Sequence, residues 1–170
     1  MSLRARRAKQ SHKIQLAILG CGNMGSAIAL GVSKKSKTFS FYTYTPTYIR
    51  ARKLARTIHG KSVKKIGDLK DCDYFLIACK PQQFPELAPE LKNIIDENSK
   101  IISVMAGVGT RRLKKELKAT KVARVMPNTP CLIGEGCAAI YFSGMTRVER
   151  RIVKKIFRAV AKLHVVTSDD

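Results

Sequence analysis

Carboxylate side chains are scarce in this sequence, and none occurs before Asp68. The 170 residues include 33 Lys and Arg but only 12 Asp and Glu, which gives a formal net charge of +21 at pH 7. An excess of this size favours partners with negative charge, such as phosphates, nucleic acids or acidic lipids. Apolar residues make up 45% of the chain and charged residues 26%, so a buried core is expected and a disordered polyelectrolyte is excluded.

Long apolar runs and paired cysteines are also missing. No segment approaches the roughly 20 apolar residues of a membrane-spanning helix, so the sequence predicts no membrane association of that kind. The cysteine count is odd and there is no C-x-x-C spacing, which argues against a disulfide scaffold, a zinc ribbon or another metal site. We therefore expect reduced thiols and a cytoplasmic protein. The cysteines are Cys21, Cys72, Cys79, Cys131 and Cys137.

The first residues form a separate basic segment. Residues 1–13 carry five Lys or Arg and are not followed by the long apolar core of a secretory signal. We predict a disordered basic tail here, with a transit peptide as the alternative. Residues 14–170 have the length of one ordinary domain and show no internal boundary.

Strand-like and helix-like segments alternate along that domain. Short apolar or β-branched runs predict strands, and apolar residues at helical spacing predict helices. The expected strands are 14–19, 39–45, 73–79, 100–105, 121–126 and 137–142, with a possible edge strand at 163–167. The expected helices are 26–32, 48–58 preceded by Thr45 as N-cap, 84–95, 110–117 and 146–163. This alternation predicts an α/β fold with a doubly wound, mainly parallel, Rossmann-like sheet and helices on both faces. Its ligand should lie beyond the carboxyl ends of the strands.

The glycine motif Gly20-x-Gly22-x-x-Gly25 directly follows the first strand and opens the first helix. In such a turn the first glycine permits the sharp bend and the second lets a pyrophosphate approach the backbone. The third allows close packing of helix on strand. Free N–H groups at the helix start then bind phosphate oxygens. A second strand follows about 20 residues later, as the dinucleotide fingerprint requires. We therefore predict a nicotinamide dinucleotide site.

The end of the second strand bears on the choice between NAD and NADP. NAD-binding proteins commonly place an acid there for the ribose 2′-hydroxyl, whereas this chain has Tyr44-Thr45-Pro46-Thr47, followed by Arg50, Arg52 and Lys53. Hydroxyls and cations would hold a 2′-phosphate. The sequence thus favours NADP(H) over NAD(H), with Thr45 as the first contact.

Several motifs together resemble pyrroline-5-carboxylate reductase, from residue 14 to about 168. They are GCGNMG after IQLAIL, YTPT, ACKPQ at 78–82, VMAGV at 104–108 and, most specifically, RVMPNTPCLIGEG at 124–136. That family uses NAD(P)H to reduce the cyclic imine 1-pyrroline-5-carboxylate to L-proline by hydride transfer, a step of proline biosynthesis. The resemblance implies cofactor contacts by Leu19, Gly20, Cys21, Gly22, Asn23, Met24, Gly25, Thr45, Lys65, Ala78, Cys79, Lys80, Pro81, Val104, Met105 and Ala106. At Lys65 the family often has Asn. Asn128, Thr129 and Pro130 would lie at the substrate mouth, although Asn128 could equally cap its own loop.

The resemblance covers only the family's N-terminal domain, and the helical domain that makes its dimer and most of its substrate pocket is absent from this chain. The sequence offers no catalytic residue of its own: His12, His59 and His164 are interpreted as structural or solvated, and no base lies beside Cys21 or Cys131. Three alternatives stay open: a fragment of a longer gene product, a natural short paralogue with a separate partner such as a helical subunit or a second copy, and a cofactor-binding module without catalysis. We also expect Ile152, Ile156 and Val160 to expose apolar surface. Nucleic-acid binding is a remote alternative that rests on the charge alone.

Overall fold

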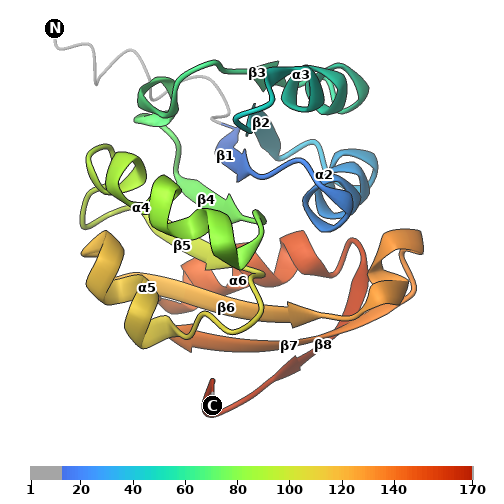
Figure 1. The fold of residues 1–170 in the computed structure, drawn as a ribbon. Coiled ribbons are helices and arrows are strands. Elements are labelled where there is room, and N and C mark those ends of the chain that lie inside the picture. The colour runs from blue at the N-terminus through green and yellow to red at the C-terminus, as the bar shows by residue number, and fades with distance from the viewer. Residues whose placement is uncertain (1–12, 170) are drawn as a thin grey trace, which may run out of the picture.

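The structure is a computed structural model that describes residues 13–169, so most of the basic segment predicted at 1–13 lies outside the described residues. One eight-stranded sheet organises these residues, in the order β3-β2-β1-β4-β5-β6-β7-β8 (Figure 1). The strands are β1 (Ile14–Leu19), β2 (Phe39–Tyr44), β3 (Lys61–Ser62), β4 (Tyr74–Ile77), β5 (Lys100–Ser103), β6 (Lys121–Pro127), β7 (Gly136–Ser143) and β8 (Ala161–Val165). The helices are α2 (Asn23–Lys35), α3 (Tyr48–Thr57), α4 (Phe84–Lys92), α5 (Thr110–Leu117) and α6 (Arg147–Phe157), with short 3₁₀ turns η2 (Ile66–Leu69), η3 (Pro81–Gln83) and η4 (Thr129–Ile133).

Six strands, β1 to β6, run parallel, and β7 and β8 run in the opposite direction. The chain starts at the centre of the sheet: β1 pairs with β2 on one side and with β4 on the other. The connections reverse direction there, which is the topological switch point where doubly wound sheets bind ligands. The predicted fold class is confirmed.

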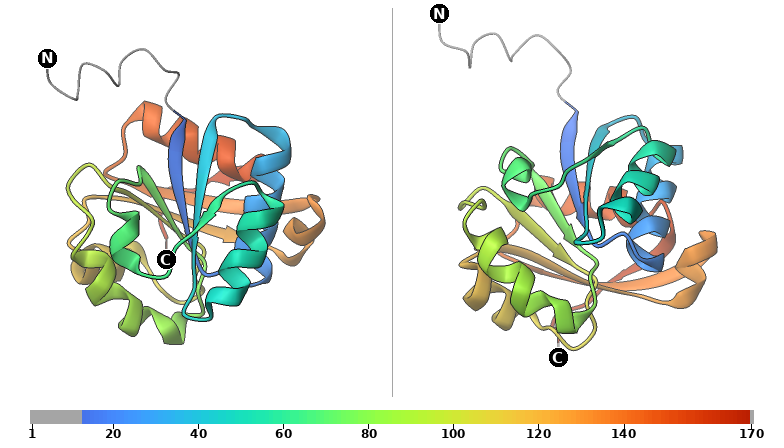
Figure 2. Two further views of the ribbon diagram at one scale, coloured as in Figure 1. Left: turned by 90° about the horizontal axis from the view of Figure 1, so that it is seen from above. Right: turned by 45° about the horizontal axis from the view of Figure 1, so that its top comes forward.

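Two apolar cores lie on the two faces of the sheet, and strand alternation separates them. Along β1, Leu16 and Ile18 face the core that contains α2, α3 and α6. Ala17 and Leu19 face the core that contains α4 and α5. Figure 2 shows these two helix groups on opposite sides of the sheet. All four residues are fully buried, as expected for a central parallel strand.

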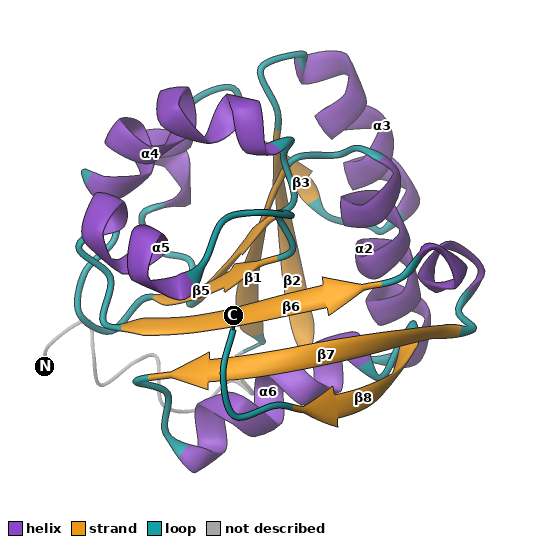
Figure 3. Ribbon diagram, turned by 60° about the horizontal axis from the view of Figure 1, so that its bottom comes forward, coloured by secondary structure: helices purple, strands orange, loops and turns teal. Residues whose placement is uncertain are grey.

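The last described residues fix the carboxyl end of the chain to the sheet. After β8 the segment 166–169 crosses β7 and ends over β6 (Figure 3). There the Asp169 carboxylate accepts a 2.5 Å hydrogen bond from the Thr110 backbone N–H, which is the start of α5. The Arg124 guanidinium donates to the Asp169 carbonyl oxygen. A carboxylate at a helix N-terminus is stabilising, so Asp169 supplies the cap that α5 lacks locally.

Several element bounds differ from the prediction by two or three residues, and four further local differences are larger or change a role. The N-cap of α3 is Thr47 rather than Thr45, and it makes no side-chain capping bond. The long helix predicted to residue 163 ends at Phe157, because the chain turns there and enters β8. Its Ile156, together with Val160, is buried rather than exposed. The two-residue β3 was missed, since two residues carry no periodic pattern. Within residues 13–169, no helix has the length and apolar character needed to cross a membrane.

Candidate functional site

The glycine turn after β1 has the backbone shape that its sequence predicts. Gly20 has φ +108°, a conformation that side chains disfavour, and its N–H donates to the Tyr44 carbonyl at 2.9 Å. A Cβ on Gly20 would lie 2.5 Å from the Cys79 backbone nitrogen. A side chain at this position would therefore clash with the backbone beyond β4, so Gly20 permits β1, β2 and β4 to end together.

The other two glycines have different surroundings. A Cβ on Gly25 would lie 2.1 Å from the Gly20 carbonyl oxygen, so Gly25 lets α2 pack directly on the turn. A Cβ on Gly22 would meet nothing within 4 Å. Gly22 is the N-cap of α2 and is exposed, which leaves its backbone open to an incoming ligand.

The N-terminus of α2 carries no local cap. No side chain caps it, its first turn holds no acidic residue, and the first backbone bond runs from the Ser26 N–H to the Gly22 carbonyl. The N–H groups of the first turn therefore have no intrahelical acceptor. Such a group of donors with the positive end of a helix dipole suits a phosphate. The turn thus fits the pyrophosphate of a dinucleotide.

A cavity of about 250 Å³ lies beside this turn, at the carboxyl ends of three neighbouring strands. It is lined by Leu19, Gly20, Tyr44, Thr45, Pro46, Ile66, Cys79, Gln83, Glu86, Leu87 and Glu90. Glu86 and Glu90 come from α4 and were missed by the sequence reasoning, which examined only the acids near β2. Their spacing of four residues puts them on one helix face, and this could have indicated them.

The loop between β2 and α3 gathers hydroxyl groups and one cation. Thr45 lines the cavity, and the Lys64 ammonium lies 5.5 Å from the centroid of the Tyr48 ring. The Ser62 hydroxyl donates to the Tyr48 hydroxyl at 3.1 Å. Lys65 is exposed at the start of η2 and does not line the cavity, whereas its neighbour Ile66 does. Lys64 is also exposed and outside the lining, but its ammonium lies over the ring of Tyr48, the first residue of α3.

The segments after β4 and β5 continue the same edge. Ala78 is held by a 2.8 Å bond from its N–H to the Leu19 carbonyl, and Lys80 is exposed ahead of the 3₁₀ turn that Pro81 begins. After β5, Val104 is half-buried, Met105 is buried and Ala106 is exposed. The buried Met105 could therefore contact a ligand only through its backbone, whereas the side chain of Ala106 is accessible.

The thiols of this edge stay protonated. Burial raises the pKa of Cys21 to about 12 and that of Cys79 to about 11, and it also raises the pKa of Cys131. The Cys21 thiol contacts the Tyr44 carbonyl and the Cys79 sulfur lies 3.7 Å from that of Met105. The raised pKa values disfavour a thiolate nucleophile at Cys21, Cys79 and Cys131.

The loop at 128–130 lies after the end of β6. The Asn128 side-chain oxygen accepts a 2.9 Å bond from the Cys137 N–H and also contacts the Cys131 thiol. Asn128 thus ties its own loop together, as the structural alternative predicted. Thr129 and Pro130 are exposed in η4, which contacts α2. The exposed Leu132 and Ile133 extend this loop with apolar surface.

Together these parts form a phosphate-binding turn, a flanking cavity and an exposed loop along one sheet edge. In residues 13–169, no group of three His, Cys, Asp or Glu side chains could hold a metal ion. The arrangement suits an elongated ligand with a central pyrophosphate.

The sequence is similar to known oxidoreductases. A model of the family described as NADP oxidoreductase, coenzyme F420-dependent, matches residues 15–107. The pyrroline-5-carboxylate reductase of Staphylococcus haemolyticus is 32% identical over 136 residues, which cover 77% of this chain and 50% of the relative. That of Haemophilus influenzae is 33% identical over 132 residues, covering 76% and 48%. The chain therefore spans about half the length of these relatives.

Solved structures have the same fold. Pyrroline-5-carboxylate reductase from Coxiella burnetii superposes with a TM-score of 0.84 at 22% identity, over 93% of this chain and 60% of that one. The Plasmodium falciparum pyrroline carboxylate reductase, solved with NADP bound, gives 0.78 at 25% identity, over 91% and 58%.

Proposed function

We propose that this chain, which belongs to the family of NADP oxidoreductases described as coenzyme F420-dependent, binds NADP(H) along the carboxyl edge of its sheet and serves the reduction of a cyclic imine of the pyrroline-5-carboxylate type. The observation that carries the proposal is the uncapped start of α2 behind Gly22, where a Cβ would meet only open space. We infer that residues 14–170 form a single dinucleotide-binding domain.

The pyrophosphate would lie against the backbone of the turn. Gly22, Asn23 and Met24 would donate their N–H groups to its oxygens, while Gly20, Cys21 and Gly25 set the shape of the turn. Leu19 is fully buried, so it would contribute through its backbone. The open space at Gly22 supports this placement.

The adenosine half would enter the cavity of about 250 Å³. Thr45 and Lys64 would meet the 2′-phosphate of NADP, with the uncapped N-terminus of α3 behind them. Glu86 and Glu90 would accept a hydrogen bond from the adenine amino group. Tyr44 lines the cavity together with Thr45 and Glu90. Burial, and to a smaller extent the charge of Glu90, raises the pKa of Tyr44. It therefore stays a neutral hydrogen-bonding group. Lys65 remains a second candidate for the phosphate.

Ala78, Cys79, Lys80 and Pro81 would pass beside the adenosine–ribose side, and the nicotinamide end would approach Val104, Met105 and Ala106. When bound, the reduced cofactor supplies a hydride to the carbon of a protonated imine. The chain itself would hold the nicotinamide ring against the substrate. Thr129 and Pro130 would approach the substrate from a loop that the Asn128 hydrogen bond stiffens. No described side chain takes part as an acid, base or nucleophile in this proposal.

Because the chain spans about half the length of its curated relatives, the complete reaction and its assembly belong to this proposal. A second copy or a separate helical polypeptide would complete the substrate pocket. All five cysteines, which lie within residues 13–169, are free. Free thiols support a reducing compartment such as the cytoplasm.

The first test compares NADPH with NADH by calorimetry. A charge-assisted contact to the 2′-phosphate contributes about 1.5–3 kcal/mol, so NADPH should bind about 10- to 100-fold more tightly. Lys64→Met should remove most of this preference, whereas Lys115→Met, which removes the same charge from the exposed face of α5, should not. Equal affinity for both cofactors would refute the NADP assignment.

The second test measures turnover. NADPH oxidation is followed by absorbance after 1-pyrroline-5-carboxylate is added to the purified chain of 170 residues. We expect rates far below the ordinary range of about 1–10³ per second, because imperfect orientation of the substrate costs several kcal/mol of barrier. Full activity of this chain alone would overturn the need for a second component. Activity that appears with a helical polypeptide would identify a split enzyme.

A further inference from the structure

A second and larger cavity, of about 450 Å³, lies at the amino-terminal edge of the sheet, opposite the glycine turn. It forms where α2 and α3 end and where β1 and β2 begin. Its size falls in the range of small-molecule sites. The lining residues are Lys13, Ser33, Lys34, Ser36, Lys37, Phe39, Ser40, Phe41, Tyr42, Thr57, Ile58, His59, Gly60 and Lys61.

The lining holds four lysines and one histidine but no carboxylate. Across residues 13–169, the ion pairs involve Arg112, Lys121 and Arg124, so the four lysines of the cavity are not paired. The acid beside the start of β1 is Asp73, and its carboxylate accepts a 2.8 Å bond from the Gln15 N–H. Among residues 13–169, the positive charge of the cavity therefore has no ion-pair partner.

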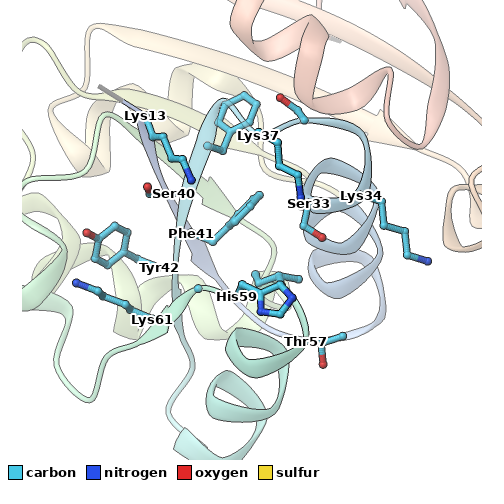
Figure 4. A pocket seen from close by; sticks show the side chains of 14 residues that line it. Lys13, Ser33, Lys34, Lys37, Ser40, Phe41, Tyr42, Thr57, His59 and Lys61 are labelled. Carbon is cyan, nitrogen blue, oxygen red and sulfur yellow. The ribbon is translucent and has the colours of Figure 1, made fainter. Parts of the chain in front are cut away.

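The lysines approach the hollow from different segments. Figure 4 shows Lys13, just before β1, and Lys37, before β2, on either side of the Phe41 ring. Lys61 is the cross-strand partner of Tyr42. Its side chain runs outward beside Tyr42, and that of Lys34 also points away from the Phe41 ring (Figure 4). Lys155 of α6 adds a further cation beside it, where its ammonium donates to the Thr38 hydroxyl at 2.6 Å.

The carboxyl ends of α2 and α3 partly neutralise the positive charge of these lysines, because the carboxyl end of a helix carries about half a negative charge. Two such ends offset about one lysine. Lys13, Lys37 and Lys61 together contribute three charges, so a clear positive excess remains. Capping of helix dipoles alone therefore does not account for the cluster.

We propose that this cavity binds a compact anion with two or more adjacent phosphate groups, at a site separate from the dinucleotide turn. Adjacent phosphates place several charges within the reach of Lys13 and Lys37, which flank the Phe41 ring, and lysine binds phosphate as a point charge. Ser36 and Ser40 line the same hollow with hydroxyl groups that can complete the contacts. A concave site that is lined by residues from separate segments suits a small ligand better than the continuous backbone of a nucleic acid.

The test is calorimetric titration with inorganic tripolyphosphate. It is carried out on the Gly22→Val variant, so that binding at the glycine turn does not contribute. We expect saturable binding of one ligand per chain. Lys13→Met combined with Lys37→Met should weaken it about tenfold or more, through the loss of two charge-assisted contacts. The matched control is Lys115→Met with Lys162→Met, which removes the same charge from exposed sites on α5 and β8 and should change the affinity little.

Three outcomes would overturn the proposal. One is the absence of saturable binding, and another is an equal loss in the two double variants, which would indicate a general effect of charge. The third is that duplex DNA binds while tripolyphosphate does not, with both double variants weakening DNA alike. ATP as a second titrant separates the sources of the phosphate group: binding of both ligands supports a site for the phosphate chain itself. When Lys13→Met and Lys37→Met are made together in the otherwise unchanged chain, with Gly22 retained, cofactor binding should be unchanged, so the test is independent of the proposed function.

Discussion

The three glycines of the turn have different surroundings, and Gly22 alone among them has open space at its Cβ position. At Gly20 and Gly25 a Cβ would meet backbone atoms at 2.5 and 2.1 Å, so substitution there disturbs the fold itself. A Cβ on Gly22 would have no neighbouring atom within 4 Å. Loss of binding and loss of folding can therefore be separated by choosing the position.

Gly22→Val should abolish tight cofactor binding and leave the melting temperature nearly unchanged. The branched side chain would occupy the space where phosphate oxygens approach the start of α2. Calorimetry with NADPH and a thermal melt measure the two effects. Gly67→Val is the matched control, because Gly67 also has open space around its Cβ position but lies in η2. If Gly22→Val bound NADPH as the wild type does, the pyrophosphate would not lie on this turn.

Helix α6 is fixed at its start by a buried carboxylate. Glu149 accepts from the Thr146 N–H at 2.7 Å and from the Lys121 ammonium at 2.8 Å, while its own N–H donates to the Thr146 hydroxyl. Burial opposes ionisation of Glu149, but the hydrogen bonds from Lys121 and Thr146 outweigh it and lower its pKa. The capping box thus joins α6 to β6.

Stability should fall at acid pH as a consequence. A carboxyl whose folded-state pKa is lowered contributes stability above its ordinary pKa of 4.5, and that stability is lost as the pH falls through the lowered value. Glu149→Gln should lower the free energy of unfolding by about 1–2 kcal/mol at pH 7 and reduce its drop below about pH 5. Urea melts at several pH values measure this. The exposed Glu97→Gln should leave the profile intact, and an unchanged profile in Glu149→Gln would contradict the assignment.

Elements were predictable where one local pattern determines them. The apolar run at 14–19 and the helix at 110–117 were predicted with their observed bounds, since each carries its own periodicity. Contacts between distant segments were not predictable. The cap of α5 comes from Asp169, 59 residues away from Thr110, and Glu86 reaches the cavity only because α4 packs beside β1 and β4.

In the candidate site, too, some features could be predicted from local sequence and others depend on how distant segments pack. The glycine turn, Thr45 and the ends of β4 and β5 follow from motif and strand order, because parallel strands end at one edge. The Lys64 ammonium lies over the Tyr48 ring at the start of α3, and this depends on the turn after β3, which no sequence pattern predicts.

At the scale of the whole molecule, two ligand sites at opposite edges should act independently. They are separated by the length of β1, six residues or about 20 Å. Each ligand at about 100 times its Kd should add about 2.7 kcal/mol to the free energy of unfolding. NADPH and tripolyphosphate together should add the sum of the two, within about 0.5 kcal/mol. Denaturant melts with each ligand and with both measure this, and a combined effect equal to one ligand alone would indicate a shared site.

Because β1 lies at the centre of the sheet, its two partner strands become available at different times during synthesis of the chain. One edge of β1 pairs with β2, which follows soon after, but the other awaits β4, whose neighbour Asp73 lies 58 residues beyond Gln15. At about 5–20 residues per second, a ribosome needs roughly 3–12 seconds to make that stretch. During this interval an apolar strand has an open side, which is the period when a chaperone would protect the nascent protein from aggregation.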